Sequence, residues 1–573
     1  MPFSYLSNVE NIPLSWSDSG SPKAIERHRA QLEKLRREGK RAWIRLDAIL
    51  TTRFWLNFND YTFLNTDSQQ RIQAQVRDWL KPSGKEFDRI YLLAEENASE
   101  PCYDITKYIW DCLQGDLDVA SRLRGRTVFR IHQIEKTSAH DFLSRTGVND
   151  FLQQVVKRYI HEFAGFLEAV VAGFSCQPPS FLSPFRTPSL TIPWSPDLVQ
   201  RFESILAVPL LDFLPLLFHE TYDSATVRST FWSGLTRHFA KVCIGELRRF
   251  CHQWGLQFAV EIPKGTSPPE IDFGTLINQA DLAILTKPDR NFLEQAGDML
   301  NIKQAQNMLV IGHSRVNPFL SMGVPRRPIL MISPIHSLWT KPDQKMWNKL
   351  IQTWKWLCKT LWDLGYDFDI VSETDLITAE INKSKHPLSL KSTSYPLVLL
   401  PGCLSLQEET VDRLTQFVKN RGRLIAVEPM PYLLNGRVGL DPYPLERLLY
   451  HRRTSILRGT ATEKAERLKR ILKKRIKRTV QIYEKPDNHP TTAIRVHHRQ
   501  SKESDFFYLF NSGEDSIETL IEFQGEMSAV EEWHPITGKQ AVLDFWNANG
   551  NTYLTKSFNP QQEWMVVTRQ HAS

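Results

Sequence analysis

The chain has 573 residues, a length that accommodates about two to four domains. Its hydrophobic content of 41% and aromatic content of 11% exclude a largely disordered protein. No run of about 18 apolar residues is present, so we expect no membrane span and no membrane partner.

The cysteines and the first residues bear on where the protein works. Seven Cys are dispersed without CxxC or Cys/His ligand spacing, which is typical of reduced thiols and predicts no metal site. The N-terminus lacks a basic start followed by an apolar core, so we expect no signal peptide. Together these features predict a cytoplasmic protein without cofactors.

The first 325 residues predict helices that alternate with short apolar strands. Residues 1–140 are the least regular part, with a charged helix and a few strands such as "RTVFRIHQI" (126–134). A Pro/Ser-rich stretch at 181–196 is typical of a loop, and 223–255 is typical of a long amphipathic helix that stops at Gly255. Strands are expected at "EAVVAGF", "LQFAVEI", "ADLAIL" and "NMLVIG". This alternation predicts a parallel α/β domain.

A second α/β unit is expected to open near residue 326. Its strands are "RRPILMISP", "DFDIVSE", "YPLVLLPG" and "RLIAVEP", with amphipathic helices between them, which indicates a small doubly wound sheet. From about 495 the chain turns to short strands separated by turn residues, and these predict a β-sandwich.

The net charge of +7 comes from one segment. Residues 464–478 hold nine Lys or Arg and one Glu, so the rest of the chain is close to neutral. Leu468, Ile471, Leu472 and Ile476 recur at helical spacing, which indicates an amphipathic basic helix packed by its apolar stripe. We therefore expect a solvated helix here and no nucleic-acid partner.

Four segments, in order, resemble the α-L-rhamnosidase-like glycoside hydrolases. They are "FLPLLFHE" with the Arg228-Ser-Thr-Phe-Trp helix, "ILMISPIHSLW", "YPLVLLPG" with its following helix, and "VEEWHPITG". The resemblance implies a partial or divergent (β/α)8 barrel, an amidotransferase-like α/β domain and a C-terminal β-sandwich. The implied divisions are 1–140 (divergent N-terminal region of the barrel), 141–325 (barrel-like), 326–490 (amidotransferase-like) and 491–573 (sandwich).

The resemblance also shows where catalytic groups would be expected. Such enzymes need one carboxyl group to protonate the leaving oxygen and a second to attack the sugar or activate water. Where the family has a "F-T-D-E-P" phrase, this chain has Phe174 to Pro178, with Cys176 and Gln177 at the two acidic positions. Where a later strand of the family ends in Ser-Glu, this chain reads Gly312-His313-Ser314. Cys176, Gln177 and His313 are therefore interpreted as degenerate catalytic positions.

Other residues remain candidates for a ligand site. Glu261 ends a predicted strand, where a catalytic acid of a barrel enzyme would lie, although an ion pair with a neighbour would explain it equally well. Trp194, His219, Glu220 and Asp281 are candidate substrate-binding residues, since aromatic rings stack on sugars and polar groups fix their orientation. Asp281 as a cap and Glu220 on a solvated loop are the structural alternatives.

Cysteine nucleophiles are a further alternative. Cys176 with His313 as its base, or Cys403 after its strand, would serve, but a buried Cys in apolar surroundings is inert.

Two functions follow from these interpretations. The first is a glycoside hydrolase-like pseudoenzyme that binds a carbohydrate or assembles as a homo-oligomer. The alternative is an active glycosidase on a rhamnoside- or galactoside-type substrate that uses a non-standard carboxylate such as Glu261.

Overall fold

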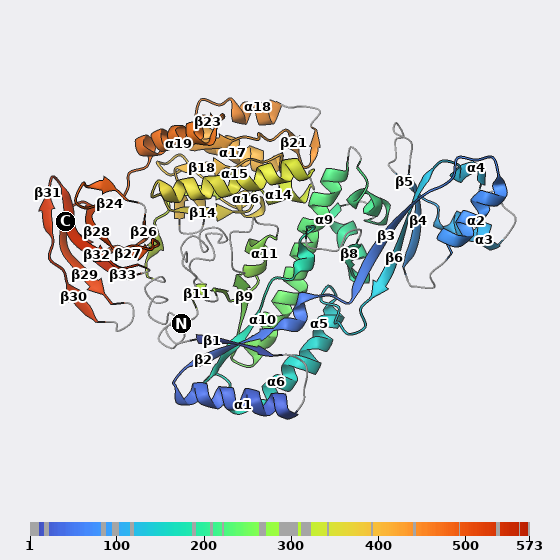
Figure 1. Cartoon of the computed structure of the whole chain (residues 1–573), viewed down its shortest axis with the longest axis horizontal. Helices are drawn as coiled ribbons and strands as arrows, with labels where there is room; N and C mark the ends of the chain where they lie inside the picture. The colour runs from blue at the N-terminus through green and yellow to red at the C-terminus, as the bar shows by residue number, and fades with distance from the viewer. Residues whose placement is uncertain are drawn as a thin grey trace.

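The computed structural model arranges the chain as three domains with one appended antiparallel sheet (Figure 1). The described residues are 11–16, 22–81, 87–93, 102–114, 120–185, 191–206, 210–220, 223–262, 271–285, 308–310, 322–340, 343–390, 393–438, 443–491, 493–534, 539–560 and 562–570. None of the helices within these ranges is both long and apolar enough to cross a bilayer.

The first domain is built on a six-stranded sheet whose neighbouring strands are all parallel. In sheet order the strands are β1 (Asn11–Trp16), β2 (Arg41–Leu46), β7 (Val171–Cys176), β9 (Gln257–Ile262), β10 (Leu282–Leu285) and β11 (Met308–Val310). Because parallel strands share one carboxyl edge, residues that end β2, β7 and β9 meet there.

Helices precede most of these strands, as in a barrel of βα units. The expected helix over 223–255 is α9 (Ser224–Phe239), a π-helical turn (Ala240–Ile244) and α10 (Gly245–Gln253) in direct succession. The other helices around the sheet are α1 (Pro22–Arg37), α5 (Arg145–Phe151), α6 (Lys157–Glu162), α7 (Pro196–Leu206), α8 (Leu210–Phe213) and α11 (Phe273–Ile277). Their apolar faces and the strands form the largest core of the molecule.

A five-stranded antiparallel sheet projects from this domain at the right of Figure 1. Its order is β5 (Cys102–Asp104), β4 (Asp88–Leu93), β6 (Thr127–Glu135), β3 (Phe54–Thr62) and β8 (Thr191–Trp194). Helices α2 (Gln69–Trp79), α3 (Thr106–Gln114) and α4 (Ala120–Leu123) lie beside it.

This sheet changes two sequence-based expectations. Of the described residues up to 140, only β1 and β2 join the parallel sheet, while β3, β4, β5 and β6 belong to the projecting sheet. The expected loop over 181–196 is wrong for 191–194, which form β8 against β3. The reason lies in the tertiary structure. The four residues "TIPW" are too short to show a strand pattern of their own, and they form a strand because they are buried against β3, which lies far away in the sequence.

The second domain is a five-stranded parallel sheet with helices on both faces. Its order is β14 (Phe368–Val371), β13 (Ile329–Ile332), β18 (Leu397–Leu400), β20 (Arg423–Val427) and β23 (Thr454–Leu457). One face packs α15 (Gln344–Asp363) and α19 (Ala461–Arg475), and the other packs α16 (Glu373–Ile377), α17 (Glu408–Lys419) and α18 (Tyr443–Leu449). The helix expected over 464–478 is the main part of α19, and its Leu468 and Leu472 are buried as the apolar stripe predicts.

Two small sheets complete this domain. They are β15 (Glu380–Ile381), β16 (Leu388–Leu390) and β17 (Thr393–Tyr395), and β19 (Ser405–Leu406), β21 (Leu433–Leu434) and β22 (Arg437–Val438). The short helix α14 (Ile335–Trp339) joins the domain to α9, where Ser229 Oγ lies 3.1 Å from His336 Nδ1.

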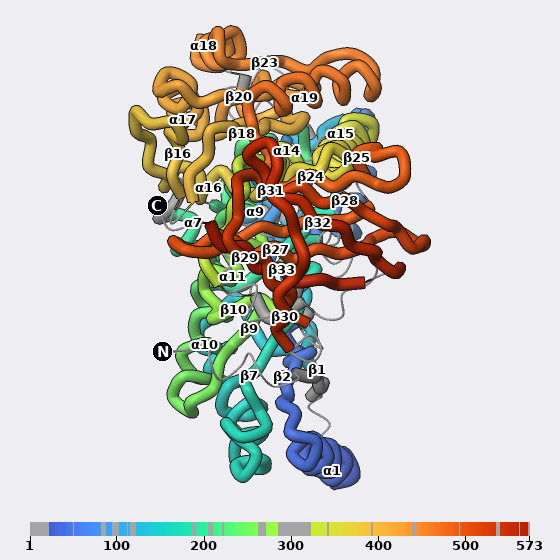
Figure 2. Tube along the Cα trace, turned by 90° about the vertical axis from the view of Figure 1, so that its left-hand side faces the viewer, coloured from blue at the N-terminus to red at the C-terminus, as the bar shows by residue number. Residues whose placement is uncertain are grey.

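The third domain is a sandwich of two antiparallel sheets, seen in front in Figure 2. One sheet runs β12 (Val324–Pro325), β26 (Ile494–Gln500), β27 (Ser504–Asn511), β33 (Glu563–Gln570), β29 (Met527–Trp533) and β30 (Gln540–Val542). The other runs β25 (His489–Pro490), β24 (Val480–Glu484), β28 (Ile517–Gln524), β32 (Asn551–Phe558) and β31 (Trp546–Ala548). The sandwich therefore begins at Val480 and also takes in β12, from before the second domain.

Candidate functional site

The carboxyl edge of the parallel sheet gathers polar side chains from three adjacent strands. Glu261, on β9, is 1% exposed, and its Oε1 accepts a 2.6 Å hydrogen bond from Ser175 Oγ on β7. On β2, Arg45 Nη1 lies 3.8 Å from Glu261 Oε2, and Arg45 Nε donates to Asp47 Oδ1 at 2.7 Å. One guanidinium thus links a buried carboxylate to a half-exposed one.

Opposing effects act on the pKa of Glu261. Burial raises it, while the Ser175 hydrogen bond, the charge of Arg45 and the amide of Gln177 lower it. Burial prevails, so Glu261 holds its proton to a higher pH than an ordinary glutamate.

Alternation along β7 gives Cys176 a different environment from Ser175. Cys176 is fully buried in the main core, and burial raises the pKa of its thiol far above the ordinary value. Its thiol lies close enough to Cys243, in the π-helical turn after α9, to influence the pKa of that residue. Cys176 therefore faces the helices, whereas Ser175 and Gln177 face Glu261.

His313 lies outside the described residues, so the structure does not place it. Cys403 is 1% exposed, and burial raises the pKa of its thiol well above the ordinary value. A thiol of this kind is neutral and inaccessible near pH 7.

The proposed substrate-binding residues are not brought to the Glu261 cluster. Trp194 is a core residue of the projecting sheet, 1% exposed, with its ring 5.2 Å from that of Phe87. A ring covered in this way cannot stack on a sugar, which corrects the expectation for Trp194.

His219 and Glu220 lie in the turn before α9. Glu220 Oε2 accepts a 2.6 Å bond from the buried Arg228, and Arg228 also donates to the His219 carbonyl. The His219 ring is 5.9 Å from Phe129 of the projecting sheet. Both residues therefore order the start of α9 against that sheet.

Asp281 lies at the opposite edge of the parallel sheet from Glu261. Its carboxylate accepts the backbone N–H of Phe258, at the start of β9, and bonds from Arg248 and His252. It anchors the amino ends of two strands, so the structure corrects its assignment to the ligand site and supports its reading as a cap.

Arg45 and Asp47 were not predicted from the sequence. They occur in "WIRLDA", where a buried strand gives way to polar residues, which is the same pattern that singled out Glu261. Residues 1–140 show no resemblance to barrel strands, so nothing in the sequence sets this strand end apart.

Comparison with known proteins supports the fold. No known protein family and no curated protein matches the chain by sequence. A catalytic mutant of Gan42B, a GH42 beta-galactosidase from G. stearothermophilus, matches it with a TM-score of 0.56 and 10% identity over 99% of this chain and 94% of that one. A beta-galactosidase from Bacillus circulans sp. alkalophilus matches with a TM-score of 0.54 and 8% identity over 99% of each chain.

A rhamnosidase is also similar. The enzyme from Novosphingobium sp. PP1Y matches with a TM-score of 0.52 and 13% identity over 82% of this chain and 53% of its own, so the chain spans about half its length. At these identities the likeness shows the fold alone. The chain shares with these proteins a three-domain fold of barrel-like, α/β and β-sandwich domains, as the resemblance in its sequence implies.

Proposed function

We propose that this chain recognises carbohydrate with a glycoside hydrolase fold but without the conventional pair of catalytic carboxyl groups. The observation that carries the proposal is the polar cluster at the carboxyl edge of the parallel sheet. There Ser175 on β7 contributes a hydroxyl, Gln177 just after β7 contributes an amide, and Glu261 is enclosed by Ser175 and Arg45. Glycosidic cleavage needs a proton donor and a carboxylate on either side of the bond, which this arrangement does not favour.

The same cluster offers groups suited to sugar hydroxyls. The side chains of Arg45 and Asp47 are 30% and 36% exposed, so the Arg45 guanidinium group and the Asp47 carboxylate remain accessible beside the buried Glu261. Planar polar groups held by neighbours are typical of sites that orient a small polar ligand.

Binding measurements test this proposal. Galactose, rhamnose and their oligosaccharides are titrated while the thermal unfolding temperature is followed, because a ligand of the folded state stabilises it. We expect stabilisation by at least one of these sugars, and its loss in Asp47→Asn. Asp412→Asn, an exposed carboxylate on α17, is the matched control and keeps the effect. Absence of stabilisation by every sugar, or equal loss in both variants, contradicts the proposal.

A second candidate is an active glycosidase. It is favoured by the raised pKa of Glu261, which suits a general acid, and by the carboxylate of Asp47 on the other side of Arg45. This candidate requires turnover of an aryl galactoside or rhamnoside that is lost in Glu261→Gln.

Self-assembly also belongs to the proposal. Three tyrosines on the α/β domain, Tyr432, Tyr443 and Tyr450, are 57%, 59% and 75% exposed, which supports a contact with a second copy of the chain. Light scattering is expected to give a multiple of the 66.5 kDa chain mass, and a monomer mass contradicts this part.

A further inference from the structure

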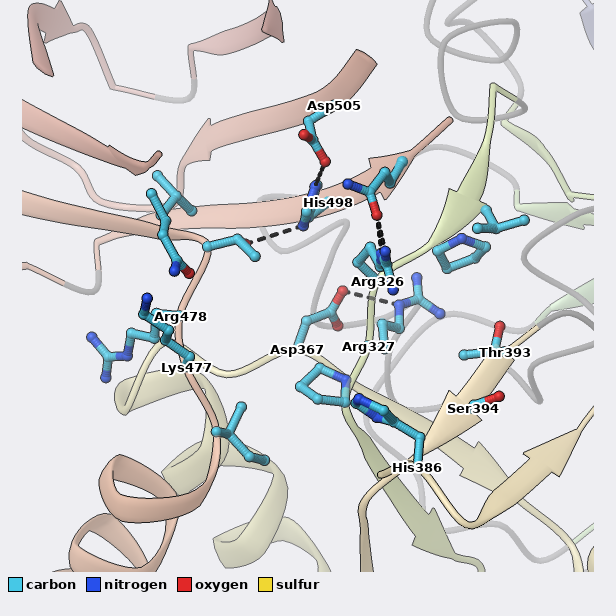
Figure 3. A pocket seen from close by; sticks show the side chains of 18 of the residues that line it. Arg326, Arg327, Asp367, His386, Thr393, Ser394, Lys477, Arg478, His498 and Asp505 are labelled. Atoms are coloured by element: carbon cyan, nitrogen blue, oxygen red, sulfur yellow. Dashed lines mark hydrogen bonds and ion pairs between the residues drawn. The ribbon is translucent and has the colours of Figure 1, made fainter. Parts of the chain in front are cut away.

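A cavity of about 770 Å³ lies where the linker into the second domain, the α/β domain and the β-sandwich meet (Figure 3). Its volume falls within the range of small-ligand sites, roughly 300–1,000 Å³. The walls come from β12 and the residues after it, from the turns around β15 to β17, from the end of α19 and from β26, β27 and β28. None of the residues of the Glu261 cluster lines it.

The charges lining this cavity are mostly positive. Five Lys or Arg residues stand against two Asp residues, and twelve further side chains of the lining are hydroxyls, amides or imidazoles. The basic residues are Arg326, Arg327, Lys385, Lys477 and Arg478, and the acidic ones are Asp367 and Asp505.

Both acidic groups already have partners. Asp367 Oδ2 accepts a 2.9 Å bond from Arg327 Nε, and Asp505 Oδ1 lies 2.7 Å from His498 Nε2. The remaining cations are therefore not neutralised by the carboxylates of the lining.

In Figure 3, Lys477 and Arg478 lie on one side of the hollow and Arg326 and His386 on the other, with the Arg478 guanidinium pointing away from Arg326. Arg326 donates to the amide oxygen of Gln500, and Arg478 donates to the Leu364 carbonyl. Among the described residues, no carboxylate lies within ion-pair distance of either of these two arginines, of Lys385 or of Lys477.

The pKa of His386 is shifted by the same positive charges. Burial lowers its pKa, and the charges of Lys385 and Arg326 lower it further. Lys385 and Arg326 thus both act on His386, so this part of the cavity wall has a positive potential that would favour a bound anion.

We propose that this cavity binds a small hydroxylated anion, a sugar or sugar-like molecule that carries a phosphate, sulfate or carboxylate group. The cations on the two sides bind the anionic group by charge-assisted hydrogen bonds. The hydroxyls of Ser384, Ser389 and Ser394, which also line the cavity, bind the hydroxyl groups of the ligand. This site is separate from the proposed carbohydrate site and does not depend on it.

Titration calorimetry on the full chain tests the inference with four probes. Galactose 6-phosphate, galactose 6-sulfate and galacturonate distinguish the three anionic groups, and galactose is the neutral reference. We expect at least one anionic probe to bind more tightly than galactose. Because each lysine can supply a charge-assisted hydrogen bond to the anion, Lys385→Ala with Lys477→Ala is expected to raise the Kd about tenfold or more.

A control pair of lysine variants shows whether the loss of binding is specific to the cavity. Both lysines are exposed, so their loss leaves the fold intact. Lys473→Ala with Lys474→Ala removes two exposed charges of α19 that do not line the cavity, and leaves the Kd unchanged. Equal weakening by both pairs, no effect of the cavity pair, or no anionic binding overturns the inference. Asp47→Asn leaves anion binding unchanged, and a loss in that variant would assign the anion to the Glu261 cluster instead.

Discussion

Individual residues at the end of β7 show how strand alternation places neighbouring buried side chains in different surroundings. Ser175 and Gln177 face Glu261, while Cys176 is enclosed among apolar side chains and helices. The sequence was sufficient to predict a strand end with no carboxylate at these positions. It was not sufficient to show which of the three side chains faces the ligand edge, because that depends on the pairing of β7 with β2 and β9.

The burial of Cys176 predicts the effect of restoring an acid there. Cys176→Asp is expected to destabilise the protein by about 3 kcal/mol or more, because a carboxyl group would be buried without a partner. Cys176→Ala, which introduces no polar atom, is the control and is expected to cost about 1 kcal/mol. Chemical unfolding measures both changes, and equal effects of the two variants would contradict the assignment of Cys176 to the core.

Glu261 predicts a pH dependence of stability. Its pKa is raised in the folded chain, so its contribution to stability is complete below its unfolded pKa and is lost as the pH rises through its folded pKa. Glu261→Gln has no charge to bury. The variant is therefore expected to gain stability relative to the wild type as the pH rises from about 4 to about 7. Thermal unfolding across this range measures the difference, and a constant or falling difference contradicts the prediction.

At the scale of helices and strands, local patterns predicted the elements that carry their own periodicity. The helix over 223–255 and the strands β7, β9, β13, β18 and β20 follow from their apolar spacing and their glycine or proline ends. The projecting sheet did not follow, because β8 pairs with β3 across more than a hundred intervening residues. Arg45 and Asp47 were missed for the same reason, since their importance depends on the neighbours that β2 acquires on folding.

The close approach of β7 and β9 at Gly173 predicts that a side chain at this position would destabilise the sheet. A Cβ atom on Gly173 would lie 2.1 Å from the Gln257 carbonyl oxygen and 2.9 Å from the Trp43 ring. Gly173→Ala must therefore separate the strands and is expected to cost about 2–3 kcal/mol. Gly165→Ala, where a Cβ would meet no atom within 4 Å, is the control. Unfolding free energies test the pair, and similar values for both variants contradict the predicted clash.

The whole molecule is held together where its three domains share side chains. Phe506, Tyr508 and Met565 of the sandwich belong to the main core of the barrel-like domain. Between the other two domains, Arg327 binds Asp367 and Asp369 of the α/β domain and lies 3.1 Å from His497 of the sandwich. The order of the domains was predicted from the sequence, but these shared contacts were not, because they join segments with no common local pattern.

Removal of Arg327 tests this junction. Arg327→Met leaves the buried Asp369 and the partly buried Asp367 without their cation and is expected to cost about 3–5 kcal/mol, with faster proteolysis between the second and third domains. Limited proteolysis and unfolding measure this, and an unchanged digestion pattern contradicts the role of Arg327.

The junction also predicts acid sensitivity. Burial raises the pKa of Asp367, but the charge of Arg327 and the hydrogen bond with His497 outweigh it and lower the pKa to about 2. The contribution of Asp367 to stability is therefore present above its ordinary value of 3.8 and is lost as the pH falls toward 2. Acid titration of the wild type is expected to show this loss, and Arg327→Met is expected to lack it. The same acid dependence in both proteins would contradict the prediction.

Hydrolysis at high enzyme concentration tests the central claim about the carboxyl edge most directly. Aryl galactosides and aryl rhamnosides are incubated with wild type, Glu261→Gln and Asp47→Asn, and release of the aryl group is followed against buffer alone. The account predicts the buffer rate for all three proteins. Turnover by the wild type that disappears in Glu261→Gln would contradict it and establish Glu261 as a catalytic residue.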